Sequence, residues 1–154
     1  MNSNDLLVDL YQQDFVKESL DFKVKRVLST DSDSVIDFIQ QRFSPRWVSE
    51  VKSGLFRSNP TCFIAVDEKQ IVGFACYDAT SKGFFGPMGV DEKYRKKGIG
   101  KSLIIHCLEA MYFDGYAYAI IGGVSERTQP FYNHVCGSKP IENSKKIYSR
   151  MFDR

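Results

Sequence analysis

The stretch that decides the fold is VDEKYRKKGIGKSLIIHCLEAM, residues 90–111. It predicts a long helix over residues 98–114, with Gly115 as the residue that ends it. Gly98 and Gly100 stand at the start of this helix, although a glycine inside a helix costs about 1 kcal/mol relative to alanine. Basic residues crowd into the turn before the helix: Lys93, Arg95, Lys96 and Lys97.

The head of such a helix suits an anion. Its first backbone N–H groups have no partner within the helix, and the helix dipole places positive charge there. A glycine lets a ligand approach the backbone closely because it has no Cβ atom. We therefore expect a phosphorylated ligand at the start of this helix. The alternative is that the basic cluster is only a solvated turn.

Two common phosphate-binding motifs are absent from this stretch. The Walker pattern GxxxxGK[ST] is present only as its tail, GIGKS (residues 98–102), because Arg95 occupies the place of its first glycine. The dinucleotide pattern GxGxxG also fails, because Leu103 stands where its third glycine belongs. Neither pattern therefore identifies the ligand.

The composition is that of one ordinary globular domain of 154 residues. The net charge of +2, from 21 basic and 19 acidic residues, is too balanced to indicate nucleic-acid binding. No apolar run is long enough to span a membrane, and the N-terminus lacks the features of a secretory signal. The cysteines are widely spaced, so we expect no metal site, reduced thiols and a cytoplasmic protein. They are Cys62, Cys76, Cys107 and Cys136.

Apolar periodicity and turn residues predict an α/β domain with a mixed sheet covered by helices. Residues 1–20 are an N-terminal extension that fits either a strand or a helix. The expected strands are residues 21–28, 61–67, 70–78, 84–90, 116–123 and 147–152, with the second and third joined as a hairpin at Glu68-Lys69 and residues 116–123 buried on both faces. The expected helices are residues 29–43, ended by Pro45, residues 46–56, residues 98–114 and residues 130–137.

Residues 95–100, RKKGIG, resemble the R/Q-x-x-G-x-G/A motif of the GCN5-related N-acetyltransferases (GNAT superfamily). The motif follows a strand that ends in PMGV (residues 87–90), as in the family. A buried strand and a helix with Phe131-Tyr132 then follow, with Gly137 a few residues on. The resemblance covers residues 22–152. It implies a single GNAT-like domain over residues 1–154, with a mixed, mostly antiparallel sheet of about six or seven strands flanked by helices.

The resemblance also implies acetyl-CoA as cosubstrate, held where two central strands, residues 83–90 and 116–122, splay apart. Backbone groups of Met88, Gly89 and Val90 would pair with its pantetheine arm. Backbone N–H groups and side chains before and at the start of the helix would hold its pyrophosphate: Arg95, Lys96, Lys97, Gly98, Ile99, Gly100, Lys101 and the Ser102 hydroxyl. Phe131 and Tyr132 would lie beside the cofactor.

The implied reaction is transfer of an acetyl group to a primary amine by direct attack, with no metal and no cysteine nucleophile. Tyr132 would act as general acid on the departing thiolate; the alternative is a packed aromatic residue. Glu126 and Glu50 are candidate bases, Glu50 also a candidate acceptor-binding residue, and solvated surface is the alternative for both. Trp47, Phe84 and Phe85 are candidate walls of the acceptor site; each is equally a candidate core residue.

Other functions stay open at this stage. A non-catalytic acyl-CoA-binding protein with the same fold would keep the helix start but need no acid or base. A nucleic-acid-binding domain would use the basic residues of 93–101, but the near-neutral net charge disfavours it.

The expected partner is therefore a small-molecule or peptide amine, with neither nucleic acid nor membrane. A homodimer is an expected assembly, since dimers are common among relatives. The sequence VSERTQ (residues 124–129) lacks an asparagine often found there in the family, which removes one expected cofactor contact.

Overall fold

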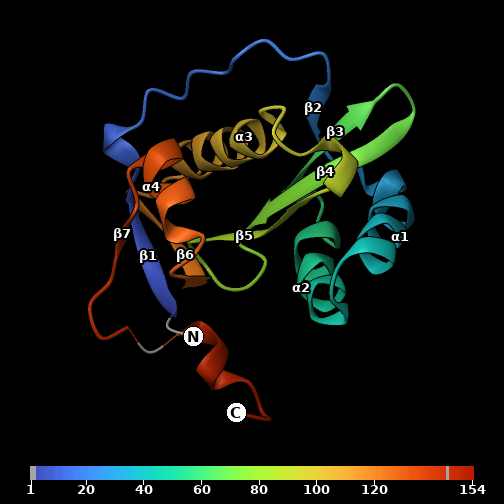
Figure 1. Ribbon diagram of the computed structural model, residues 1–154. Coiled ribbons are helices and arrows are strands. Elements are labelled where there is room, and N and C mark those ends of the chain that lie inside the picture. Colours follow the sequence, from blue (N-terminus) through green and yellow to red (C-terminus); the bar gives the residue numbers. More distant parts are fainter. Residues whose placement is uncertain (1–2, 145) are drawn as a thin grey trace.

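The computed structural model describes residues 3–144 and 146–154. Its strands form one sheet of seven strands in the order β2-β3-β4-β5-β6-β1-β7 (Figure 1). Only the β5–β6 pair is parallel, which confirms the expected mixed and mostly antiparallel sheet. The strands are β1 Ser3–Asp9, β2 Lys23–Arg26, β3 Cys62–Asp67, β4 Gln70–Tyr77, β5 Phe84–Val90, β6 Tyr118–Ser125 and β7 Lys139–Pro140.

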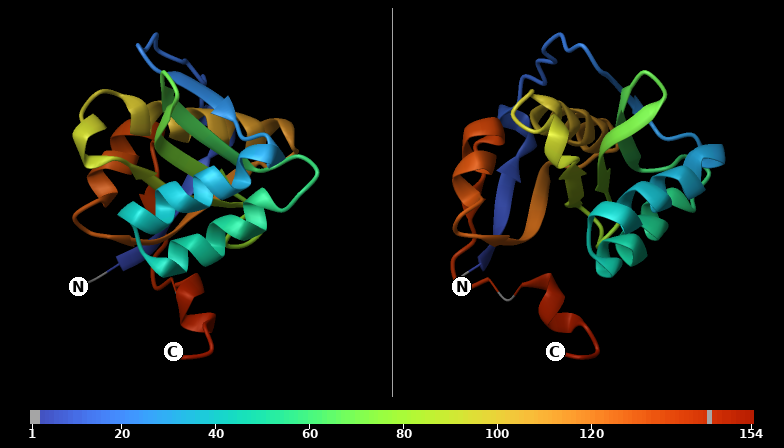
Figure 2. Two further views of the ribbon diagram at one scale, coloured as in Figure 1. Left: turned by 90° about the vertical axis from the view of Figure 1, so that its right-hand side faces the viewer. Right: turned by 45° about the vertical axis from the view of Figure 1, so that its right-hand side comes forward.

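Four α-helices cover the two faces of the sheet. They are α1 Ser32–Arg42, α2 Pro45–Leu55, α3 Ile99–Phe113 and α4 Gln129–Cys136. Buried side chains of α3 and α4 form one core cluster with β1, and those of α1 and α2 form a second cluster with Ile64 and Phe74. Figure 2 shows the α1–α2 pair on the side of β3 and β4 away from α3. Short 3-10 helices complete the chain: η1 Leu10–Gln12, η2 Ser29–Asp31, η3 Glu92–Tyr94 and η4 Ile147–Arg150.

The boundary between α1 and α2 corrects the role expected for Pro45. α1 ends at Arg42, and Pro45 is the first residue of α2 instead of the stop signal of α1. Proline suits this position because the first N–H groups of a helix lack partners in any case. The Ser44 side chain caps α2 by accepting hydrogen bonds from the N–H groups of Arg46 and Trp47.

The predicted long helix is confirmed as α3, and its two ends have glycines in the left-handed region. Gly98 is the N-cap with φ +84°, and Gly115 follows the helix with φ +103°. A residue with a Cβ adopts this conformation at a cost of about 1–2 kcal/mol. The glycine at position 98 is therefore required by the backbone path into α3.

Strand β6 is not buried on both faces, contrary to the expectation for residues 116–123. Ala119, Ile121 and Val124 are buried, whereas the Tyr118 side chain is 52% exposed. The buried side chains face the α3–α4 core. On the opposite face Ile147 of η4 packs against Gly122.

The two ends of the chain also differ from expectation. The ambiguous N-terminal segment forms β1, which pairs with β6 and buries Leu6 and Val8. Residues 147–152, expected as a strand, contain η4 (Ile147–Arg150) and no strand, and Phe152 is 99% exposed. β1 occupies the edge of β6 that a last strand would need, so the C-terminal segment packs across the sheet. No helix among residues 3–144 and 146–154 has the length and apolar character needed to cross a membrane.

Candidate functional site

The centre of the sheet opens between β5 and β6. These strands pair only at Phe84–Ile120 and Phe85–Ile121, and then diverge. A cavity of about 950 Å³ lies at the divergence, bounded by β5, β6, α2 and the starts of α3 and α4. We call it the central cavity. The strand pairing confirms the splay that the resemblance implied.

The cavity edge of β5 has backbone groups that β4 does not use. The Asp91 N–H donates to the Val72 carbonyl at 2.8 Å, and the register then places Gly89 opposite Phe74. In an antiparallel pair, alternate residues bond to the neighbouring strand and those between them point the other way. Met88 and Val90 therefore direct their N–H and C=O groups away from β4, toward the cavity.

The start of α3 forms one end of the cavity. Gly98, Ile99, Gly100 and Lys101 all line it. The first hydrogen bond within the helix runs from the Ser102 N–H to the Gly98 carbonyl at 3.1 Å. The N–H groups of residues 99–101 therefore have no partner inside the helix, and they present donors and positive dipole charge to the cavity.

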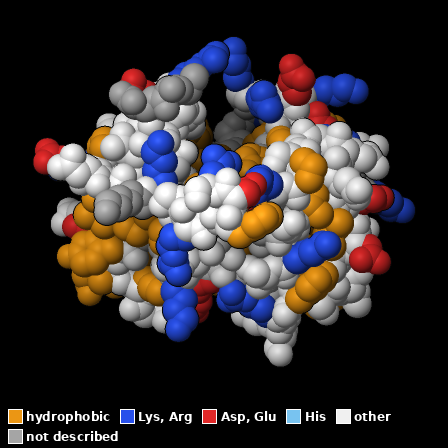
Figure 3. Space-filling model, turned by 90° about the horizontal axis from the view of Figure 1, so that it is seen from below, with side chains coloured by type: hydrophobic (Ala, Val, Ile, Leu, Met, Phe, Trp, Pro, Cys, Tyr) orange, Lys and Arg blue, Asp and Glu red, His pale blue; other side chains and the backbone are white. Residues whose placement is uncertain are grey.

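Some of the basic residues border the cavity and others do not. Arg95, Lys96 and Lys101 line it, whereas Lys97 lies outside its lining. The Lys101 ammonium pairs with the exposed Glu18 carboxylate at 2.8 Å. Figure 3 shows Lys and Arg side chains around a hollow in this face of the molecule. The positive charge expected beside the helix start is therefore contributed by three of these side chains.

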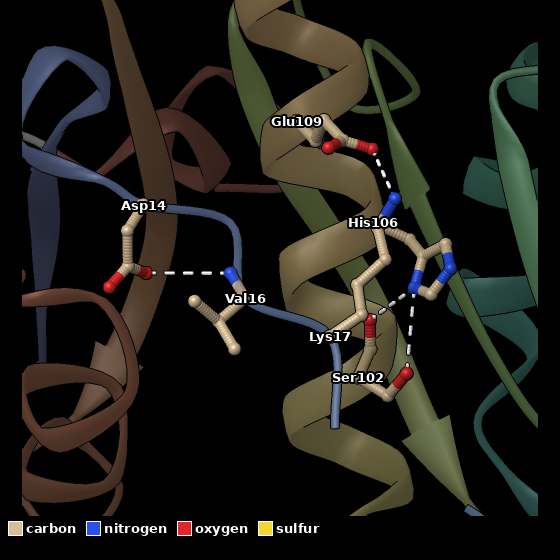
Figure 4. Close-up of polar contacts among 6 residues, drawn as sticks. All are labelled: Asp14, Val16, Lys17, Ser102, His106 and Glu109. Atoms are coloured by element: carbon tan, nitrogen blue, oxygen red, sulfur yellow. Dashed lines mark hydrogen bonds and ion pairs between the residues drawn. The ribbon is translucent and has the colours of Figure 1, made fainter. Parts of the chain in front are cut away.

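The structure does not bring the Ser102 hydroxyl to the cavity. Ser102 is only 7% exposed, and its Oγ lies 3.5 Å from Nδ1 of His106, one turn further along α3 (Figure 4). The His106 ring also approaches the Ser102 carbonyl at 2.8 Å, and burial lowers the pKa of His106. On the same part of α3, Glu109 pairs with Lys17 of the segment between η1 and β2. This face of α3 is structural, and Ser102 does not line the cavity.

Tyr132 lies in the wall of the cavity, on α4. Its ring is 9% exposed and packs edge-on against Phe85, with ring centroids 6.3 Å apart, and against Phe131. Its hydroxyl is not fully buried and forms no hydrogen bond with the residues that the structure describes. Burial raises the pKa of Tyr132 well above its usual value, so the hydroxyl keeps its proton at neutral and alkaline pH.

Residues of α2, with one residue just after α1 and one of η4, form another part of the cavity lining, which we call the acceptor end. Its residues are Phe43, Arg46, Trp47, Glu50 and Tyr148. The Trp47 ring contacts Phe43 and Phe74, with ring centroids 5.2 and 5.9 Å apart, so it belongs both to the core and to the cavity wall.

Two expected site residues lie elsewhere. Glu126 is exposed in the turn before α4 and does not line the cavity. Phe84 packs beside Gly122, where an added Cβ would come within 3.1 Å of its ring, and it does not line the cavity. Glu50 and Trp47, three residues apart on α2, therefore line the cavity together. Phe85 lines it beside Tyr132, from the α3–α4 core, whereas Glu126 and Phe84 do not line it.

Tyr148 is the residue that sequence reasoning missed. It was expected in a closing strand, yet its hydroxyl donates to Glu50 Oε2 at 3.1 Å. The two residues are 98 positions apart, so no local pattern joins them. The one available signal was the glycine pair at 122–123, which leaves room for a ring against β6.

The cysteines are free and buried in the described structure. Burial raises the pKa of Cys76, of Cys107 and, to about 11, of Cys136, which disfavours the reactive thiolate. Among residues 3–144 and 146–154 no group of three or more His, Cys, Asp or Glu side chains is arranged to hold a metal ion.

Residues 17–137 match the model of the acetyltransferase (GNAT) family. This match spans more than half of the chain, and the chain therefore belongs to that family. No curated protein matches the sequence significantly.

Solved structures share the fold at low sequence identity. The GCN5-related glucosamine N-acetyltransferase region of a fungal multi-domain β-N-acetylglucosaminidase is 15% identical with a TM-score of 0.73, covering 90% of this chain and 20% of that one. A GCN5-related N-acetyltransferase from Sphaerobacter thermophilus is 20% identical with a TM-score of 0.70, covering 90% and 48%. A Trypanosoma brucei acetyltransferase is 20% identical with a TM-score of 0.60, covering 80% and 96%. The chain thus spans less than half the length of the first two structures.

Proposed function

We propose that this protein transfers an acetyl group from acetyl-CoA to a primary amine. The observation that carries the proposal is the free backbone edge of β5 leading to the start of α3. Met88 turns its N–H and C=O groups, and Val90 its N–H group, into the cavity, while the Val90 carbonyl accepts from Arg95 Nε at 3.3 Å. The N–H groups of residues 99–101 lie at the end of this edge. An extended amide-bearing chain that ends in a phosphate fits this arrangement, because it would pair as an added strand and place its anion at the helix start.

The glycine at position 100 supports the fit. A Cβ atom added there would have no protein atom closer than 3.7 Å, so the fold itself does not require glycine. The space kept open by its missing side chain faces the cavity beside unpaired N–H groups. A phosphate group that touches the backbone would use this space.

The cavity also holds the groups that acetyl transfer needs. An amine must lose its proton before it can attack, because an ammonium with a pKa near 10.4 has no lone pair. The Glu50 carboxylate, directly or through water, would accept that proton. A backbone N–H of residues 88–90 would stabilise the negative charge that develops on the carbonyl oxygen. The Tyr132 hydroxyl, which its raised pKa keeps protonated, would donate to the departing thiolate.

Release of free CoA thiol from acetyl-CoA in the presence of a panel of primary amines tests this proposal. We expect thiol release that depends on the amine and yields an N-acetyl product by mass spectrometry. Binding of acetyl-CoA without amine-dependent release would instead indicate an acyl-CoA-binding protein that has the fold but no turnover. No binding of either CoA or acetyl-CoA by calorimetry would contradict both functions.

A further inference from the structure

Tyr148 connects the C-terminal segment to the central cavity. It belongs to η4, its ring lines the acceptor end, and its hydroxyl donates to Glu50 Oε2 at 3.1 Å. Burial, followed by the nearby Glu50 charge, raises the pKa of Tyr148 to about 12. The hydroxyl therefore remains a hydrogen-bond donor throughout the neutral range.

Two glycines of β6 leave room for η4 and for the Tyr148 ring. A Cβ atom at Gly123 would lie 3.0 Å from the Tyr148 ring, and one at Gly122 would lie 3.1 Å from Ile147. Both distances are too short for ordinary contact, so this glycine pair is what lets η4 lie against the strand. Gly123 has φ +64°, and the Asp5 carboxylate holds its N–H at 2.8 Å.

Two hydroxyl groups fix the same oxygen of Glu50. Thr80 Oγ1 donates to Oε2 at 2.5 Å and Tyr148 donates to it at 3.1 Å. A carboxylate can accept on both of its oxygens. Within residues 3–144 and 146–154, Oε1 accepts no hydrogen bond and no cationic group lies within 4.0 Å of the carboxylate. Glu50 is thus held by one oxygen and retains the other for a ligand.

The surroundings of Glu50 are apolar and aromatic. Phe43 and Trp47 line the cavity and contact each other, and Trp47 lies one turn before Glu50 on α2. The guanidinium of Arg46, which also lines the cavity, is paired with the Asp153 carboxylate at 2.6 Å. Aromatic faces attract cations, whereas a paired arginine offers little to an acceptor's carboxylate.

We propose that Tyr148 is a positioning residue that orients Glu50 toward the acceptor, and that the acceptor is a cationic primary amine on an apolar body without a neighbouring carboxylate. The proposal rests on the proposed function and names the substrate class of the same site. Glu50 holds the ammonium through its second oxygen, and the aromatic walls enclose the apolar body. Tyr148 and Thr80 keep the carboxylate in the orientation that this contact needs.

The acceptor class is tested with one expected acceptor and two comparison amines. These are 2-phenylethylamine, L-phenylalanine, which adds a carboxylate to the same body, and glucosamine, which replaces the apolar body by hydroxyl groups. We expect kcat/KM for 2-phenylethylamine to exceed that for either other probe at least tenfold. Equal or better use of L-phenylalanine or glucosamine would overturn the assigned acceptor class.

The role of Tyr148 is tested with Tyr148→Phe, which keeps the ring against Gly123 and removes only the hydroxyl. We expect KM for 2-phenylethylamine to rise about three- to tenfold, with KM for acetyl-CoA unchanged, because a hydrogen bond to a charged group is lost. Thr80→Val removes the other donor and should act in the same direction. Glu50→Gln should raise the amine KM more than either. The matched control is Tyr118→Phe, which removes the hydroxyl of an exposed tyrosine distant from the cavity lining.

The outcomes separate the two proposals. If no amine in a broad panel releases thiol from acetyl-CoA, the proposed function fails. If amines are acetylated but Tyr148→Phe behaves like Tyr118→Phe, the positioning role alone is wrong. A Tyr148→Phe variant that raises both KM values together would show a structural residue and overturn the positioning role as well.

Discussion

Replacing Gly100 by alanine should stabilise the folded protein and weaken its binding of CoA. Gly100 lies in the first turn of α3, and its φ angle is an ordinary helical one. A Cβ atom there would have its nearest contacts with Phe131, Met88 and Val90 at 3.7–3.9 Å, which is normal van der Waals contact. The fold therefore loses nothing on substitution, while the cavity loses the open space beside its N–H groups.

The two effects can be estimated separately. Alanine is favoured over glycine in a helix by about 0.5–1 kcal/mol, and a domain of this size gains about 2–4 °C in melting temperature per kcal/mol. We therefore expect a rise of about 1–4 °C without ligand. A methyl group that displaces a phosphate from the backbone removes a hydrogen bond to a charged group, worth about 1.5–3 kcal/mol. That corresponds to about a 10- to 100-fold rise in Kd for CoA.

Thermal denaturation without ligand and calorimetric titration with CoA measure the two quantities on one sample. Gly98→Ala is the contrasting variant: its φ of +84° and the Leu20 side chain 3.3 Å from the added Cβ predict a lower melting temperature as well as weaker binding. A Gly100→Ala protein with a raised melting temperature and unchanged CoA affinity would refute the reasoning, because the phosphates would then lie elsewhere.

Three further predictions follow from single side chains. Tyr132→Phe should lower kcat about 10- to 100-fold with little change in KM for acetyl-CoA. This loss of kcat should grow from about pH 6 to 9, because solvent supplies fewer protons at higher pH. A rise in KM with kcat unchanged in steady-state kinetics would make Tyr132 a cofactor-positioning residue. Gly89→Ala should destabilise the fold by about 1–3 kcal/mol, since its Cβ would lie 2.5 Å from the Phe43 ring; an unchanged midpoint in urea would contradict this. His106→Gln should reduce the loss of stability on acidification. The pKa of His106 is lowered in the folded protein, so the unfolded chain takes up the proton first as pH falls through about 6.5, and this favours unfolding in the wild type. Parallel curves of melting temperature against pH for both proteins would exclude this role.

Local signals predicted the helix start and the basic turn that border the central cavity. The basic turn and the glycines at 98 and 100 are neighbours in the sequence. Their combined role as an anion site could therefore be predicted without knowing any long-range contact. The same holds for the β3–β4 hairpin, whose two-residue turn at Glu68-Lys69 is confirmed. The direction of the Ser102 side chain was misjudged, although its spacing from His106 places both on one helical face.

Long-range packing decided what the sequence could not predict. β1 pairs with β6 although most of the chain separates them, and it takes the edge of β6 that lies away from β5, where residues 147–152 do not pair. The C-terminal segment then crosses the open face of β6, where it places Tyr148 on Glu50. The acceptor end is therefore assembled from segments that lie far apart in the sequence, so local sequence patterns could not predict which of its residues meet.

The central claim is that the acetyl group moves directly from acetyl-CoA to an amine in the central cavity. The most direct test is carbon NMR with acetyl-CoA labelled with ¹³C at the acetyl carbonyl, mixed with the protein and an accepted amine such as 2-phenylethylamine. The account predicts that the thioester carbonyl signal is replaced by an amide carbonyl signal of the N-acetyl product, with no labelled acetate. A label that stays on the thioester, or that appears only as free acetate, would contradict it.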